Sequence, residues 1–171
     1  MSTLGKLGLL GSLYLSQGLP FGFFTQALPV LLRERGLSLP AIGLSSLLAL
    51  PWALKFLWAP LIDRCGRRKS WIVPLQVAAA LLSAALAFAD TARAIGWLLA
   101  GVLLTTLVAA TQDVATDGLA VELLSESERG LGNGLQVAGY RGGMIVGGGA
   151  LLVAFARSGW RATFLAMAAL L

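Results

Sequence analysis

Four ionisable side chains stand within or at the edge of long apolar segments, where a charge is costly. They are Lys55, Asp113, Asp117 and Arg141. An ionised side chain at the centre of a membrane helix costs about 2.5 kcal/mol or more on insertion scales, so each needs a partner or a wet cavity. The chemistry open to two acids and two bases in such a place is proton transfer and the binding of ionic groups.

Asp113 and Asp117 are four residues apart, which places both carboxylates on one face of a helix. Two carboxylates this close do not stay equally ionised away from water, so the pair predicts a proton-coupling site. We expect Asp113 to carry the proton and Asp117, which is nearer the end of its segment, to be structural. Lys55 and Arg141 are then counter-ions or clamps for a solute carboxylate, a role that suits arginine's planar guanidinium. An ion-pair cluster that only fixes helix packing is the alternative.

Three glycines recur every four residues in the fifth apolar segment: Gly139, Gly143 and Gly147. This spacing lets two helix backbones approach closely, so it predicts helix packing in preference to a moving hinge.

The elements that must hold these residues are membrane helices. The chain has 171 residues, of which 57% are hydrophobic and 12% charged, and its mean hydropathy is +0.82; soluble domains carry about 25% charged residues. The apolar runs are too long for barrel strands and show no alternation, so an all-α membrane protein is predicted. A single bundle over 1–171 is expected, with spans at about 7–32, 40–62, 71–89, 95–120, 134–156 and 160–171. The sixth is too short to cross a bilayer, so it is expected to be truncated.

Other function classes find no support in the residues. The sequence has no His and one cysteine, Cys65, so no metal or cofactor site is expected. It lacks a Gly-x-Ser-x-Gly elbow and a phosphate-binding glycine loop, so no enzyme is predicted. The net charge of +5 comes without a long basic run, which argues against nucleic acid and for contact with membrane lipid.

The densest cationic loop, 63–69, reads DRCGRRK. Positive loops favour the cytoplasm, so this loop predicts a cytoplasmic N-terminus. The loop also resembles a signature of the major facilitator superfamily, in which an acid and bases latch neighbouring helices as the carrier changes state. The resemblance implies a conformational latch made by Asp63, Arg64, Gly66, Arg67 and Arg68. Ala59 stands where that family usually has glycine, and a plain positive anchor is the alternative.

Three further stretches narrow the resemblance: YLSQGLPFG at 14–22, PWALKFLWAP at 51–60 and ATQDVATDG at 110–118. They are similar to the AmpG muropeptide permease family, which is related to acetyl-CoA transporters, and the similarity runs from about Tyr14 to Gly149. It implies the N-terminal half of a twelve-helix carrier that imports anhydromuropeptides with protons across the bacterial inner membrane for peptidoglycan recycling. The alternatives are a carrier of another anionic solute, such as an acyl-CoA-like nucleotide conjugate, and a truncated scaffold that does not transport.

In such carriers the first and fourth helices line the cavity. Tyr14, Gln17 and Gln112 therefore become candidate solute contacts, with hydrogen bonds between helices as the alternative. Alternating access needs two bundles, so we expect a missing C-terminal bundle or self-association as partner, besides protons and a small muropeptide-like solute.

Overall fold

The computed structural model describes residues 2–88 and 95–171, which form helices with short connections and contain no strand. Five helical segments are long and apolar enough to cross a membrane. The α-helices are α1 (Thr3–Gly22), α2 (Leu28–Glu34), α3 (Leu39–Ser45), α4 (Leu50–Leu54), α5 (Ala59–Arg64), α6 (Arg68–Ala87), α7 (Ile95–Leu123), α8 (Arg129–Ile145) and α9 (Leu151–Leu170).

The first membrane segment, Thr3–Glu34, passes through Pro20 without a break. Its start is capped by Ser2, whose hydroxyl accepts from the Gly5 backbone N–H. A π-helical turn at Phe23–Ala27 follows the proline and leads into α2. Such turns absorb a locally altered hydrogen-bond pattern, so this segment is irregular in its middle.

The second segment is divided into short helices by its prolines. Pro40, Pro51 and Pro60 each occupy the second position of α3, α4 and α5, where the missing N–H costs least. Tight 3-10 turns at Ser46–Ala49 and Lys55–Leu57 join the pieces. This segment packs loosely, and only 6% of its most apolar window is buried.

The third and fourth segments, α6 and α7, are long helices that pack side by side. α7 reaches Leu123, so Asp113 and Asp117 lie within a continuous helix of 29 residues. Residue 89, the predicted end of the third span, lies outside the described residues.

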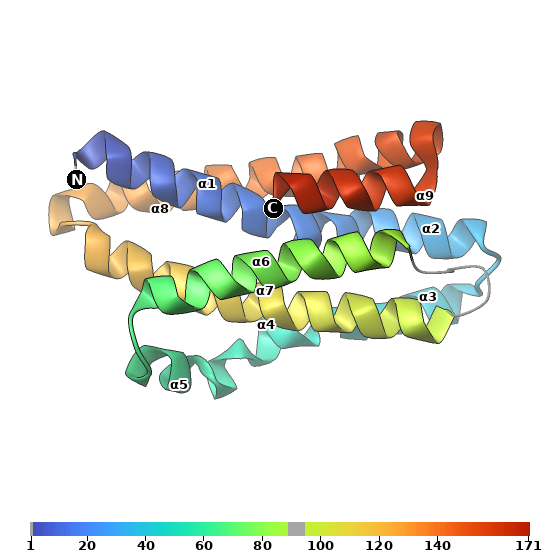
Figure 1. Ribbon diagram of the computed structural model, residues 1–171, viewed down its shortest axis with the longest axis horizontal. Coiled ribbons are helices and arrows are strands. Elements are labelled where there is room, and N and C mark those ends of the chain that lie inside the picture. The colour runs from blue at the N-terminus through green and yellow to red at the C-terminus, as the bar shows by residue number, and fades with distance from the viewer. Residues whose placement is uncertain (1, 89–94) are drawn as a thin grey trace.

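From α8 onward the chain runs along the bundle and then turns back beside itself. A π-helical turn at Val146–Ala150 joins α8 to α9, and α9 changes direction at Gly159, which has a φ of +76°. Glycine tolerates this left-handed conformation, which allows the reversal. The C-terminus lies part-way along the bundle (Figure 1).

Figure 1 shows α1 alongside α8, and α6 alongside α7. The N-terminus, α5 and the turn between α7 and α8 share one end, which we call the latch end. There Glu128 accepts hydrogen bonds from the Thr3 hydroxyl at 2.6 Å and the Lys6 ammonium at 2.9 Å, which ties the start of the chain to α8. The largest apolar core lies toward the other end and includes Phe23, Leu98 and Phe164.

Candidate functional site

A cluster of three charges forms where α7 faces the broken second segment. Lys55 begins the 3-10 turn that Pro51 precedes, and Asp113 and Asp117 lie one turn apart on α7. The Lys55 ammonium donates to Asp113 Oδ2 and lies 3.7 Å from Asp117 Oδ2. We call these three residues the charge cluster. One cation between two acids leaves a net charge of −1 when both acids are ionised.

Asp117 has more partners than Asp113. Its Oδ1 accepts from the Tyr14 hydroxyl at 3.2 Å and from Gln136 Nε2 at 3.0 Å. Its side chain is 41% exposed, whereas that of Asp113 is 12% exposed. Asp117 therefore joins α1, α7 and α8, while the only partner of Asp113 among the described side chains is Lys55.

Arg141 lines the same space as the charge cluster and makes no ion pair or hydrogen bond with a described residue. A cavity of about 310 Å³ is lined by Lys55, Asp113, Asp117, Gln136, Val137, Tyr140 and Arg141. The structure thus brings all four predicted intramembrane charges to one cavity, the charge cavity. It pairs Lys55 with the acids and leaves the Arg141 guanidinium available.

Two further cavities meet the charge cavity at Asp117. One of about 490 Å³, the latch cavity, runs from Lys55 and Asp117 to Asp63, Arg68 and Glu122. The other, of about 320 Å³, lies between Tyr14 and the start of α8. Asp117 therefore stands at the junction of three hollows in the half of the bundle near the latch end.

The two glutamines predicted to contact a solute are buried in hydrogen bonds between helices. Gln17 Nε2 donates to Thr116 Oγ1 at 2.6 Å, and Gln112 Nε2 donates to Gln76 Oε1. Gln17 Oε1 has no described partner. Neither glutamine lines one of the three cavities. In the structure both glutamines form hydrogen bonds between helices, which is the alternative to contact with a solute.

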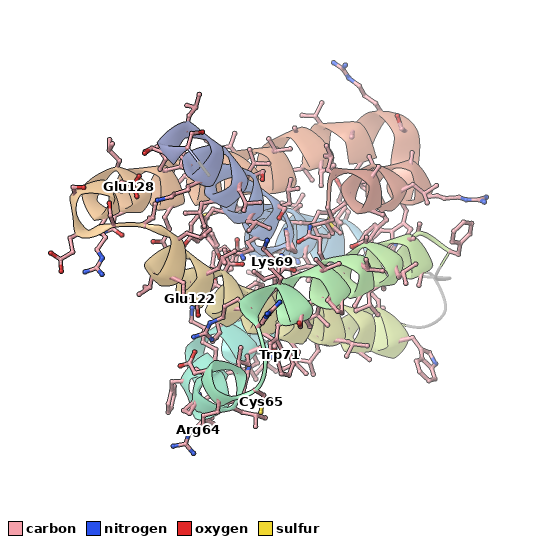
Figure 2. The ribbon with its side chains drawn as sticks, turned by 60° about the vertical axis from the view of Figure 1, so that its left-hand side comes forward. Arg64, Cys65, Lys69, Trp71, Glu122 and Glu128 are labelled. Atoms are coloured by element: carbon pink, nitrogen blue, oxygen red, sulfur yellow. The ribbon has the colours of Figure 1, made fainter. Side chains whose placement is uncertain are left out.

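The cationic loop 63–69 at the latch end makes one set of ion pairs through Arg68. Its Nη1 donates to Asp63 Oδ1 at 2.6 Å, and its Nε donates to Glu122 Oε1 at 3.1 Å. We call Asp63, Arg68 and Glu122 the latch. Figure 2 shows Glu122 near the end of α7, with Arg64 at the end of α5 and Cys65 in the loop that follows.

The other residues predicted for the latch take different places. Arg64 and Arg67 are exposed and form no ion pair with a described residue. Gly66 adopts a φ of +78°, which turns the loop between α5 and α6.

The three predicted packing glycines lie against α1. A side chain at Gly143 would overlap the Leu15 carbonyl oxygen, and one at Gly147 would overlap that of Leu19. Gly139 faces Gly11 O, at 3.1 Å from where its Cβ would lie. α1 contributes glycines of its own, Gly18 and Gly22, which were not predicted to take part. We call this contact the glycine seam.

Sequence reasoning missed Gln136, Tyr140 and Glu122 as members of these sites. Gln136 and Tyr140 are four residues apart on α8 and share a face. That spacing can be read from the sequence, but the glycines around it favoured helix packing as the interpretation of the segment. Glu122 lies one turn beyond Gly118, near the end of α7.

This helical bundle, with an intramembrane charge cluster and a charged latch at one end, belongs to the Major Facilitator Superfamily, whose family model matches residues 10–171. The chain is similar to the anhydromuropeptide permease of Escherichia coli, with 34% identity over 162 residues, 91% of this chain and 33% of the relative. An uncharacterized protein of Haemophilus influenzae is 38% identical over 155 residues, 88% of this chain and 36% of the relative. A putative transporter, AmpG 4, of Rickettsia conorii is 28% identical over 161 residues, 88% of this chain and 39% of the relative.

These comparisons confirm the predicted all-α membrane fold of the major facilitator type and the resemblance to muropeptide permeases. The chain spans about a third of the length of these curated relatives.

Proposed function

We propose that this chain is the N-terminal bundle of a secondary carrier that imports anhydromuropeptides together with protons across the bacterial inner membrane. The observation that carries the proposal is the Arg141 guanidinium, which pairs with none of the described residues and lies in a cavity where Lys55 is held by two acids. Arginine binds carboxylates bidentately, and muropeptides carry carboxylates. The name of the Escherichia coli relative supports the same solute class.

The charge count of the cavity supports proton coupling. Lys55 and Arg141 balance Asp113 and Asp117 when all four are ionised. A carboxylate bound at Arg141 adds one negative charge, which is costly in a poorly hydrated site. A proton taken up by one of the acids restores the balance, so binding of solute and proton favour each other.

The loop at the latch end supports a cytoplasmic N-terminus, because its cations favour that side. Labelling of the exposed Cys65 by an impermeant maleimide tests this orientation. Reaction is expected in inverted vesicles, and reaction only in right-side-out vesicles contradicts it.

The test of the function is uptake of labelled anhydromuropeptide, driven by a pH gradient, into proteoliposomes that hold the carrier containing this chain. Arg141→Gln is expected to weaken solute binding at least tenfold, since hydrogen bonds to charged groups contribute about 1.5–3 kcal/mol. The matched control is Arg157→Gln, an exposed arginine on α9 outside the three cavities. Equal uptake by both variants contradicts the clamp, and uptake of acyl-CoA in place of muropeptide contradicts the solute class.

A further inference from the structure

Gly118 lies directly beneath the latch. A Cβ added at this position would be 2.7 Å from both Cζ and Nε of Arg68 and 3.0 Å from Nη2. Non-bonded carbon atoms prefer about 3.5–4.0 Å, so even a methyl group does not fit beneath the guanidinium. The Arg68 guanidinium therefore lies against the backbone of α7.

This placement determines which bonds Arg68 can make. Its Nη1 reaches Asp63 at the end of α5, and its Nε reaches Glu122, one turn beyond Gly118 on α7. The side chain is only 14% exposed, whereas the two acids are 52% and 57% exposed. The acids are thus half in solvent, and the arginine between them adds a polar bridge to the apolar contact that Ile62 of α5 makes with α7.

We propose that Gly118 is a positioning residue of the latch: because it has no side chain, it seats the Arg68 guanidinium where it can hold Asp63 and Glu122 at once. Gly118 follows Asp117 directly, and both line the latch cavity together with Arg68. The position of Gly118 therefore connects the latch to the charge cluster through a single turn of α7.

The substitution Gly118→Ala distinguishes an effect on the position of Arg68 from an effect on the stability of the fold. The atoms that a new methyl group would meet belong to the flexible end of Arg68 and not to a neighbouring backbone. The helix can stay in place while the guanidinium moves off Glu122 or Asp63. Gly96, also on α7, provides the matched control, because a Cβ there would meet nothing within 4 Å. Both substitutions replace glycine by alanine in α7, and only that at Gly118 brings a methyl group against Arg68.

The native Cys65 provides the readout, since it is the chain's single cysteine and is exposed in the same loop. A nitroxide attached to Cys65 in the purified chain in nanodiscs reports the mobility of the loop. Gly118→Ala is expected to raise the mobile fraction about twofold or more, as Arg68→Ala does, and Gly96→Ala to leave it unchanged. In the Arg68→Ala background, Gly118→Ala is expected to add nothing, because residues that act through one contact are not additive.

Three results would overturn the proposal: wild-type mobility in Gly118→Ala, additive effects in the double variant, or loss of helicity by Gly118→Ala in both the wild-type and Arg68→Ala backgrounds. The last result would show that Gly118 acts independently of Arg68. None of these readouts depends on solute, so a failure to carry anhydromuropeptide leaves this inference standing.

Discussion

Asp113 and Asp117 differ in their ion-pair and hydrogen-bond partners, although they occupy the same face of one helix. Asp113 is the more buried and pairs with Lys55 alone, whereas Asp117 also accepts from Tyr14 and Gln136. Protonation of Asp113 disturbs one ion pair, while protonation of Asp117 disturbs contacts to α1 and α8. This difference favours Asp113 as the proton carrier and Asp117 as the acid that organises the site.

We therefore predict that Asp113→Asn abolishes proton-driven uptake by the complete carrier and leaves its helicity unchanged. Asparagine keeps the shape and one acceptor but cannot ionise, so the coupling is lost while Lys55 keeps Asp117 as a partner. The measurement is accumulation at a fixed pH gradient, with Glu126→Gln in the exposed turn before α8 as control. Undiminished accumulation by Asp113→Asn would assign the proton to another group.

At this scale, the positions of the charges in apolar segments predicted that acids and bases meet, but not which of them pair. Lys55 and Arg141 were both expected to be able to meet the acids, and only Lys55 does so. The reach of a long side chain depends on how helices rotate against one another, which a single sequence does not encode locally. The Gln17 and Gln112 bonds depend on the same rotation.

The glycine seam decides how closely α1 and α8 approach. Carbonyl oxygens of Leu15 and Leu19 occupy the places where side chains of Gly143 and Gly147 would lie. Without a hydrophobic driving force between helices in lipid, such close packing supplies much of the association energy. The seam therefore holds Tyr14 of α1 and Gln136 of α8 within reach of Asp117.

We predict that Gly143→Ala destabilises the bundle by about 1–3 kcal/mol, the usual cost of overpacking, because the new methyl group meets backbone that cannot rotate away. Gly142→Ala, on the same helix with nothing within 4 Å of its Cβ, should be neutral or slightly stabilising. Unfolding in mixed micelles measures the difference. A similar stability for both variants would mean that the seam relaxes freely.

At the scale of elements, the glycine period correctly predicted a packing face, because close approach requires small residues whatever the partner. The form that the chain takes around its prolines could not be predicted. The second segment contains three short α-helices joined by 3-10 turns, and the first contains a π-helical turn after Pro20. Which alternative hydrogen bonds replace the lost ones depends on neighbouring helices.

Considered as a whole molecule, the bundle leaves its second segment largely uncovered. Phe56 and Leu57, next to Lys55, are 63% and 65% exposed. The charge and latch cavities are therefore walled on one side by an element with few contacts to the rest of the chain. We propose that another surface completes this site, because alternating access requires a second bundle that can rock against it.

We predict that the isolated chain does not accumulate anhydromuropeptide in proteoliposomes, because it has no opposing bundle to move against. Addition of the remaining part of the carrier, or assembly of two copies, is expected to restore uptake. Uptake that scales linearly with a chain shown to be monomeric would contradict this prediction and favour a different transport mechanism.

The class of the whole molecule was the easiest feature to predict from sequence, because hydropathy reports directly on the solvent that surrounds each helix. The loop 63–69 and the stretch 110–118 added the family, because both resemble motifs of that family. The cavities could not be predicted, because their walls combine the turn at Lys55–Leu57 and α5 with parts of α6, α7 and α8 that lie farther along the chain.

The contacts that the first helix makes with residues of α7 and of the turn before α8 also have a consequence for biosynthesis. Thr3 meets Glu128 across 125 residues, and Gln17 meets Thr116 across 99. At about 5–20 residues per second, a ribosome needs roughly 6–25 s to make the 125 residues that separate Thr3 from its partner. Until α7 and α8 have been synthesised, Tyr14 and Gln17 remain in the insertion machinery or in lipid without their native partners. The nascent first helix therefore needs surroundings that tolerate its polar face.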